Sequence, residues 1–149
     1  FSAVYSLTNF AIYMVGLVLK WIRETGGLGA MAERNAEKAA LLYDFLDQST
    51  LFRTPVHADS RSHMNVVFRS ASDELDSKFL AEAGKRGMEG LKGHRSAGGI
   101  RASIYNACPR ESVVALVDFM KEFEPTPDYF GSLVPSLRKV TTESAPAPV

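Results

Sequence analysis

The chain has 149 residues, of which 46% are hydrophobic and 23% are charged, a composition typical of one folded globular domain rather than of a disordered chain. Its 17 basic residues balance 17 acidic ones, so no field of one sign would attract nucleic acid, and we expect no nucleic-acid partner. The single cysteine, Cys108, excludes an internal disulfide.

A first helix is expected from the apolar residues that fill nearly every position of 9–24. Thr8 or Asn9 offers an N-cap, and Gly26-Gly27 offers the stop. A helix that is apolar on nearly every face is normally covered on most sides, so we expect this one to be buried. Its longest apolar run, 10–19, is too short to cross a bilayer, which takes ~20 residues.

A second helix is expected over residues 29–48. Its apolar residues fall on one stripe, whereas Asn35 and Lys38 belong to the polar positions, so we expect this helix to be half buried. The stripe consists of Met31, Leu42, Phe45 and Leu46.

The sheet is expected to begin at MNVVF, because this segment is rich in β-branched and aromatic residues. Strands are expected at 64–68, 88–92 and 100–105. Helices are expected at 73–85, between the first two strands, and at 110–123, after the third. Ser72 or Asp73 offers the cap of the middle helix. The order predicts an α+β fold in which helices pack a short sheet.

The last part of the chain, 125–149, changes in composition and is expected to be an irregular, proline-rich tail. It contains an apolar cluster, so a solvated extension and a docking segment both stay open. The cluster consists of Tyr129, Phe130, Leu133, Val134 and Leu137.

The stretch LKGHRSAGGIRASIYNA, residues 91–107, holds the side chains best suited to binding an anion. His94, Arg95 and Arg101 lie on either side of Gly98-Gly99. Arginine offers a planar fork that matches a carboxylate or a phosphate, and a turn without Cβ atoms admits an anion close to the backbone. The same residues also fit a surface arginine, an internal ion pair and a histidine bonded to a carbonyl, so the pattern alone leaves the anion site open.

That stretch resembles a signature of the phosphoserine aminotransferases. Four further blocks resemble the family in the same order along the chain, and the match covers about residues 10–124. The blocks are FAIYMVGLVLKWI (10–22), GGLGAMAERNAEKAALLYD (26–44), RSHMNVVF (61–68) and VVALVDFMKEFE (113–124).

The resemblance implies the small carboxy-terminal domain, with its connecting helices, of a pyridoxal-phosphate enzyme of the aspartate-aminotransferase fold type. Such an enzyme exchanges an amino group between glutamate and 3-phosphohydroxypyruvate, giving phosphoserine and 2-oxoglutarate in serine biosynthesis. Arg101 matches the family arginine that binds the substrate α-carboxylate. His94 and Arg95 match the pair that holds the substrate phosphate, at a site completed across the family's homodimer interface.

The cofactor side of the family's active site is expected to be absent from this chain. The lysine that forms the internal aldimine and the aspartate that pairs with the pyridine nitrogen both precede the first matching block, so the resemblance assigns no catalytic residue here. We expect that the chain alone neither transaminates nor binds pyridoxal phosphate, and that it needs a protein partner: the missing large domain, a dimer mate or a larger assembly. Phe1 stands where an initiator Met would, which fits a fragment or a processed product.

Residues 1–9 depart from the family pattern. The family usually shows Asn-Thr-Pro-Pro-Thr there, in a loop that reaches the cofactor phosphate of the neighbouring subunit, whereas this chain reads VYSLTN. Ser6 and Thr8 remain as the hydroxyl donors toward that phosphate. We therefore expect an altered loop at 1–9, the domain at 10–124 and the tail at 125–149.

Three functions stay open at this point. The first is a portion of an active phosphoserine aminotransferase, and the second is a repurposed, non-catalytic subunit of a larger assembly. The third is a module that binds a small phosphorylated ligand without chemistry. No metal site is expected, and we expect a soluble protein of the cytoplasm or of an organelle matrix, plastid or mitochondrion.

Overall fold

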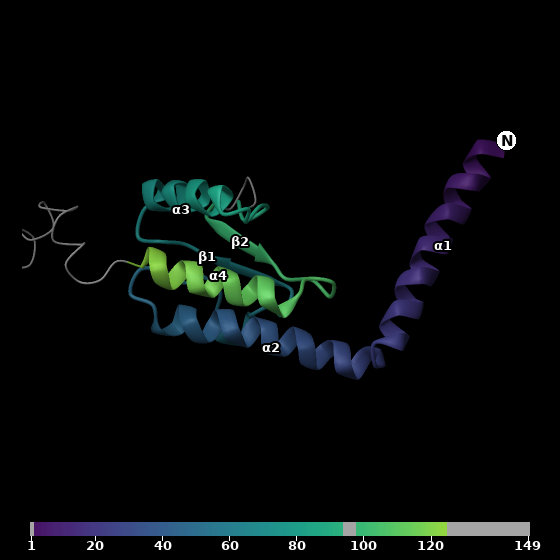
Figure 1. Cartoon of the computed structure of the whole chain (residues 1–149), viewed down its shortest axis with the longest axis horizontal. Coiled ribbons are helices and arrows are strands. Elements are labelled where there is room, and N and C mark those ends of the chain that lie inside the picture. The colour runs from purple at the N-terminus through teal and green to yellow at the C-terminus, as the bar shows by residue number, and fades with distance from the viewer. Residues whose placement is uncertain (1, 94–97, 125–149) are drawn as a thin grey trace, which may run out of the picture.

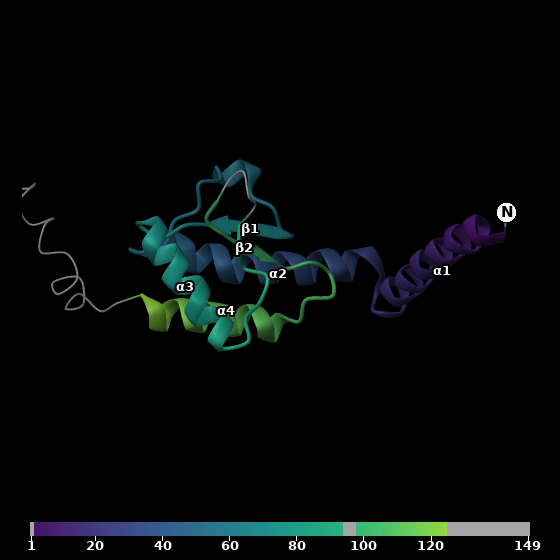
Figure 2. The same cartoon turned by 90° about the horizontal axis from the view of Figure 1, so that it is seen from above.

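The computed structural model describes residues 2–93 and 98–124, with side chains from Thr8 onward. Helices α2, α3 and α4 pack against one face of a two-stranded sheet, and α1 extends away from them (Figures 1 and 2). This arrangement confirms the expected α+β fold. The elements in chain order are α1 (Ser2–Glu24), α2 (Gly27–Gln48), η1 (Ala58–Ser60), β1 (Asn65–Phe68), α3 (Asp73–Lys85), β2 (Ile100–Ser103) and α4 (Arg110–Phe123).

Strands β1 and β2 pair in antiparallel register, with Asn65 opposite Ser103 and Phe68 opposite Ile100. The strand expected at 88–92 is wrong, because that segment forms only one isolated bridge, between Lys92 and Ile100. Gly90 explains the difference: its φ of 75° turns the backbone out of the extended conformation that a ladder requires.

One face of the sheet lies against the three helices. The alternate residues Val66 and Phe68 of β1 and Ile100 and Ala102 of β2 are buried there, as the two-residue period of a strand requires. Six phenylalanine rings dominate the core behind them. Phe79 of α3 lies at the centre of this cluster, with its ring centroid 4.9–6.1 Å from those of Phe52, Phe68, Phe119 and Phe123.

Helix α2 is buried more deeply than its sequence predicts. Asn35 and Lys38, expected on the polar side, are only 4% and 3% exposed. Both side chains face the connection between β2 and α4, whose polar groups accept their hydrogen bonds. Tertiary packing supplies these acceptors, and therefore a pattern read along α2 alone placed both residues wrongly.

Helix α1 begins earlier than expected and lies apart from the core. The loop expected at 1–9 is wrong, because α1 already begins at Ser2; this segment contains no proline or glycine that would stop a helix. Its large apolar side chains are exposed from Phe10 to Trp21, so the described part of this chain does not supply the cover that its apolar composition predicts. Only the carboxy-terminal end of α1 approaches the other elements (Figure 1). Within the described residues, no helix is both long and apolar enough to span a membrane.

Polar side chains fix the start of α3 and link the end of α4 to the end of α2. Ser72 is the N-cap of α3, as predicted, and its Oγ accepts a hydrogen bond from the amide of Leu75 at 3.3 Å. At the end of α4, Oε1 of Glu124 accepts hydrogen bonds from Ser49 Oγ, Thr50 Oγ1 and the amides of Thr50 and Leu51. Glu124 thereby ties α4 to the end of α2.

We expect Glu124→Gln to lower the free energy of unfolding at pH 7 by about 1 kcal/mol, because an amide replaces the ionised acceptor. Burial favours the neutral carboxyl group, but the hydrogen bonds to Oε1 outweigh it and hold the pKa of Glu124 below its usual 4.5. The stabilisation is therefore present above pH 4.5 and is lost as the pH falls through the folded-state pKa. Urea unfolding between pH 3 and 7 should show the variant approaching wild type at acid pH, and a constant gap would contradict this account.

Candidate functional site

Arg101 lies on the face of β2 that is turned away from the core. It is paired with Val67 of β1 and follows the buried Ile100, so the alternation of the strand directs it outward. Its Nε is buried, yet it has no hydrogen-bond acceptor among the described residues. A buried donor without a partner costs about 1–3 kcal/mol, and a carboxylate or phosphate placed against the guanidinium would remove that cost.

The loop expected to bind phosphate begins and ends beside Arg101. The amide of Gly93 donates to the carbonyl oxygen of Gly99 at 2.9 Å, and the amide of Arg101 donates to that of Leu91 at 2.7 Å. A Cβ atom on Gly93 would lie 2.1 Å from the carbonyl oxygen of Gly98, so only glycine fits at this crossing. The described ends of the loop are therefore held two residues from Arg101, whereas His94 and Arg95 lie outside the described residues.

The space beside Gly98 and Gly99 is occupied by the side chain of Arg69. A Cβ atom on Gly98 would lie 2.8 Å from Arg69 Nη2, and one on Gly99 would lie 2.8 Å from Arg69 Cγ. Both glycines also have positive φ, 65° and 69°. The absence of side chains on these glycines thus makes room for a second arginine, Arg69, near Arg101. Arg69 was not identified from the sequence, although it directly follows β1.

Polar side chains continue along the same face of the sheet. Ser103 Oγ donates to Asn65 Oδ1 at 3.2 Å, and Asn65 Nδ2 donates to Tyr105 Oη at 3.2 Å. Because Tyr105 accepts this hydrogen bond, its own hydroxyl hydrogen is left to donate elsewhere. The outward face therefore carries a guanidinium and a row of polar groups, as a site for a polar anionic ligand requires.

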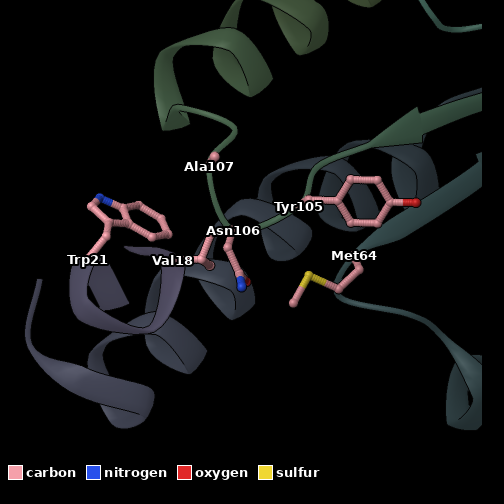
Figure 3. Close-up of a pocket in the computed structure, with 6 residues that line it drawn as sticks. All are labelled: Val18, Trp21, Met64, Tyr105, Asn106 and Ala107. Carbon is pink, nitrogen blue, oxygen red and sulfur yellow. The ribbon is translucent and has the colours of Figure 1, made fainter. Parts of the chain in front are cut away.

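A pocket of ≈ 380 Å³ lies between α1 and the connection that follows β2. Figure 3 shows Trp21 and Val18 of α1 on one side of it and Met64 on the other, with Asn106 between them, while the ring of Tyr105 points away from α1. Apart from the Asn106 amide, the Tyr105 hydroxyl and the Trp21 ring nitrogen, the side chains around the pocket are apolar, and Arg101 is not among them. The pocket and the arginine are therefore separate features of the surface.

Two buried side chains of α2 support the wall of this pocket. Asn35 Nδ2 donates to Asn106 Oδ1 at 2.7 Å. The Lys38 ammonium group donates to the carbonyl oxygens of Ile104, Tyr105 and Cys108 at 2.8–3.1 Å. Burial lowers the pKa of Lys38, and the nearby Cys108 thiol partly opposes that shift.

The two hydroxyl residues of the first segment, Ser6 and Thr8, are not brought to this site. Both belong to the amino-terminal turns of α1, which point away from the sheet (Figure 1). The described part of the chain thus does not bring Ser6 and Thr8 together with Arg101.

The buried lysine of the described residues is poorly suited to bind the pyridoxal phosphate that the resemblance implies. A Schiff base needs a lysine whose amino group is free to react. Lys38 is the one buried lysine among the described residues, and its ammonium group is fully occupied by three carbonyl oxygens. Within the same residues, no three histidine, cysteine, aspartate or glutamate side chains gather closely enough to hold a metal ion.

Comparison with known proteins gives one consistent result. Residues 6–116 match the aminotransferase class-V family. A phosphoserine aminotransferase from Bacillus cereus is 55% identical to this chain over 116 residues, which are 78% of this chain and 32% of that protein.

Solved structures agree with the sequence match. Phosphoserine aminotransferase from Bacillus circulans subsp. alkalophilus superposes with a TM-score of 0.75 at 55% identity, over 77% of this chain and 32% of that one. The pyridoxal-phosphate-bound phosphoserine aminotransferase from Trichomonas vaginalis gives a TM-score of 0.71 at 43% identity, over 75% and 32% of the two chains. This chain spans about a third of the length of the relatives it matches.

Proposed function

This chain belongs to the class-V aminotransferase family, and we propose that it is the carboxy-terminal portion of a phosphoserine aminotransferase. The whole enzyme would exchange an amino group between glutamate and 3-phosphohydroxypyruvate, giving phosphoserine and 2-oxoglutarate. The identity to phosphoserine aminotransferases over 78% of the chain supports this reaction, and the resemblance noted in the sequence is confirmed at the level of the family.

Arg101 is the observation that carries the proposal. All four reactants have an α-carboxylate, and the buried Nε of Arg101 lacks an acceptor that such a carboxylate would supply. The phosphate of the substrate would be held by His94 and Arg95, on the loop that begins at Gly93. The hydrogen bond from Gly93 to Gly99 keeps the start of this loop close to Arg101, which supports a shared site for the two ends of one substrate.

Pyridoxal phosphate would be held by the other two thirds of the enzyme, because the buried lysine of this chain is committed to carbonyl oxygens. When bound there, the cofactor supplies the electron sink that amino transfer needs. The contribution of this chain is to bind and orient the substrate through its anionic groups.

A chimera tests the proposal. In it, this chain replaces the matched 116 residues of the Bacillus cereus enzyme. We expect the chimera to transaminate, and Arg101→Ala to lower kcat/KM about 10–100-fold for both glutamate and phosphohydroxypyruvate, because both carry the carboxylate. The exposed Arg110 of α4 provides the matched control, and Arg110→Ala should leave kcat/KM unchanged.

Changes at His94 and Arg95 should alter the kinetic constants of the same chimera in a different way. Alanine at either position should raise KM for the phosphorylated substrates and leave that for glutamate nearly unchanged. Full activity of Arg101→Ala would contradict the proposed role of Arg101.

A repurposed, non-catalytic subunit is the second candidate, and the helical conformation of residues 2–9 favours it. The family pattern has two prolines in this segment, and proline is poorly tolerated inside a helix, so the segment has lost the family's loop here. A chimera that folds and binds pyridoxal phosphate but does not transaminate would support this candidate over the first.

A further inference from the structure

We infer that Arg69 is a positioning residue for Arg101, and that it acts through the Gly98-Gly99 turn, which leads into β2. The inference rests on the proposed function, because the ligand of Arg101 is taken from there. It adds a residue from outside the stretch 91–107, and it identifies what holds two consecutive glycines in one conformation beside Arg101.

Arg69 lies on the same face of the sheet as Arg101. Val67 of β1 pairs with Arg101 of β2, so the same register two residues further on brings Arg69 opposite Gly99. Because side chains alternate between the two faces of a sheet, Arg69 points outward like Val67 and Arg101. Diagonal neighbours on one face of an antiparallel pair lie ~7–8 Å apart, so the two arginine side chains start close together.

The side chain of Arg69 lies along the backbone of the turn. A Cβ atom on Gly99 would lie 2.8 Å from Arg69 Cγ and 3.0 Å from Arg69 Nε, and one on Gly98 would lie 2.8 Å from Arg69 Nη2. The contact thus runs from the aliphatic stem to the guanidinium group, over both glycines. Arg69 is accordingly half-buried, although its side chain is charged and long enough to reach solvent.

The backbone of Arg69 is held on both sides, so its side chain starts from a fixed point. Its amide and its carbonyl oxygen form two hydrogen bonds of 2.9 Å with Arg53. The preceding Phe68 is fully buried, and the amide of the following Ser70 donates to Asp76 Oδ1 of α3 at 2.7 Å. Arg69 therefore connects the turn to the core of the domain.

The turn itself provides little restraint. Gly98 and Gly99 have φ of 65° and 69°, and glycine adopts positive and negative φ about equally readily. The carbonyl oxygens of the turn contact Gly93, and the space where its side chains would lie holds Arg69. Removing the Arg69 side chain would leave that space open, and the turn would gain conformational freedom.

Arg101 is only two residues from the turn, so a change in the turn reaches it directly. Its buried Nε has no acceptor among the described residues. A carboxylate must meet the planar guanidinium in one orientation to form two parallel hydrogen bonds with it. Arg69 thereby sets the orientation of Arg101 without touching the substrate.

The charge of Arg69 is a separate property from its packing, and Arg53 allows the two to be distinguished. Arg53 pairs with Arg69 in an antiparallel bridge and therefore carries its own positive charge on the same face. It is exposed, and no atom of it is among the nearest neighbours that a Cβ atom on Gly98 or Gly99 would meet. Arg53→Ala thus removes a charge from this face without opening the turn.

The kinetic test uses the chimera. Arg69→Ala should raise KM about 10-fold for both glutamate and phosphohydroxypyruvate and change kcat less than about 2-fold. The effect falls on KM because Arg101 binds the carboxylate before the reaction as well as during it. Arg69→Lys, whose stem and charge follow a similar path, should keep KM within about 3-fold of wild type. Arg53→Ala should leave both constants unchanged.

A double variant shows whether Arg69 acts through Arg101 or on the substrate itself. Arg101→Ala removes the group that Arg69 positions, so adding Arg69→Ala to it should change kcat/KM less than about 2-fold. A further loss as large as that of Arg69→Ala alone would overturn the inference and make Arg69 a direct ligand of the substrate.

Hydrogen exchange in the full chain by itself gives a readout that does not depend on the reaction. The amide of Arg101 donates a hydrogen bond of 2.7 Å next to the turn, whereas that of Ile104 donates one of 2.9 Å beyond the far end of β2. We expect Arg69→Ala to speed exchange at Arg101 about 10-fold and to leave Ile104 nearly unchanged, because the opening is local to the turn. Arg53→Ala should change neither amide.

The outcomes separate this inference from the proposed reaction. Unchanged exchange at Arg101 in Arg69→Ala would overturn the positioning role. Equal acceleration at Arg101 and Ile104 would also overturn it, because Arg69 would then only stabilise the whole domain. Faster exchange at Arg101 in a chain whose chimera does not transaminate would support the positioning role and remove the proposed activity. Should alanine prevent folding, Arg69→Met, which keeps the stem over Gly99, gives the same comparison.

Discussion

Replacing Phe79 with alanine should lower the free energy of unfolding of the chain by about 3–5 kcal/mol, the range found for large aromatic residues removed from protein cores. Phe79 is fully buried, and its ring contacts those of four other phenylalanines from three different parts of the chain. Alanine would leave a cavity between α3, α4 and the sheet that rigid neighbouring rings fill poorly. Chemical denaturation followed by far-ultraviolet circular dichroism measures the change.

The exposed Leu28 supplies the control for this prediction. It is 78% exposed in the first turn of α2, so Leu28→Ala should change the free energy of unfolding by about 0.5 kcal/mol or less. Phe79→Leu, which keeps most of the volume, should cost clearly less than Phe79→Ala. Equal effects of leucine and alanine would mean that the packed ring cluster does not stabilise this domain.

The elements with strong local signals were predicted well from the sequence. Helix α4 occupies 110–123 as expected, and Ser72 caps α3 as expected, because apolar periodicity and a capping serine act within a few residues. The β-branched and aromatic residues of 64–68 and the strand-like run 100–105 after the Gly98-Gly99 turn likewise located β1 and β2. The segment 88–92 failed because a glycine with positive φ interrupts it, which its apolar residues do not reveal.

The features that depend on distant contacts were not predictable in this way. Lys38 is read as a surface residue of α2, since nothing near it in sequence shows that three carbonyl oxygens 66–70 residues later surround its ammonium group. The apolar composition of helix α1 predicts that another surface covers it, but composition does not show whether that surface belongs to this chain. In the structure of this chain the helix is exposed. In the candidate site, the buried Nε of Arg101 lacks an acceptor among the described residues, and its role in binding an anion stays a prediction. Arg69 was missed because its position depends on glycines 29 and 30 residues away.

Lys38→Met should lower the free energy of unfolding by about 2–4 kcal/mol, because three carbonyl oxygens at the end of β2 would lose their common donor. Methionine keeps the apolar stem of lysine, so the loss would come from the ammonium group. The same change should speed amide hydrogen exchange at Cys108, whose amide donates to the carbonyl oxygen of Tyr105 within this connection. The exposed Lys85 is the control, and Lys85→Met should have little effect on either measurement.

The pH dependence of the free energy of unfolding distinguishes an effect of the buried Lys38 ammonium group from an effect of side-chain packing alone. The pKa of Lys38 is lowered from 10.5 by burial, so over the range just below 10.5 the unfolded chain binds more protons than the folded chain. The contribution of this group to stability therefore rises with pH through its folded-state pKa toward 10.5. The stability gap between wild type and Lys38→Met should accordingly widen from pH 8 to pH 10. A stability gap that stays constant from pH 8 to pH 10 would show that the Lys38 ammonium group is not buried. It would also contradict the role of Lys38 in supporting the pocket wall.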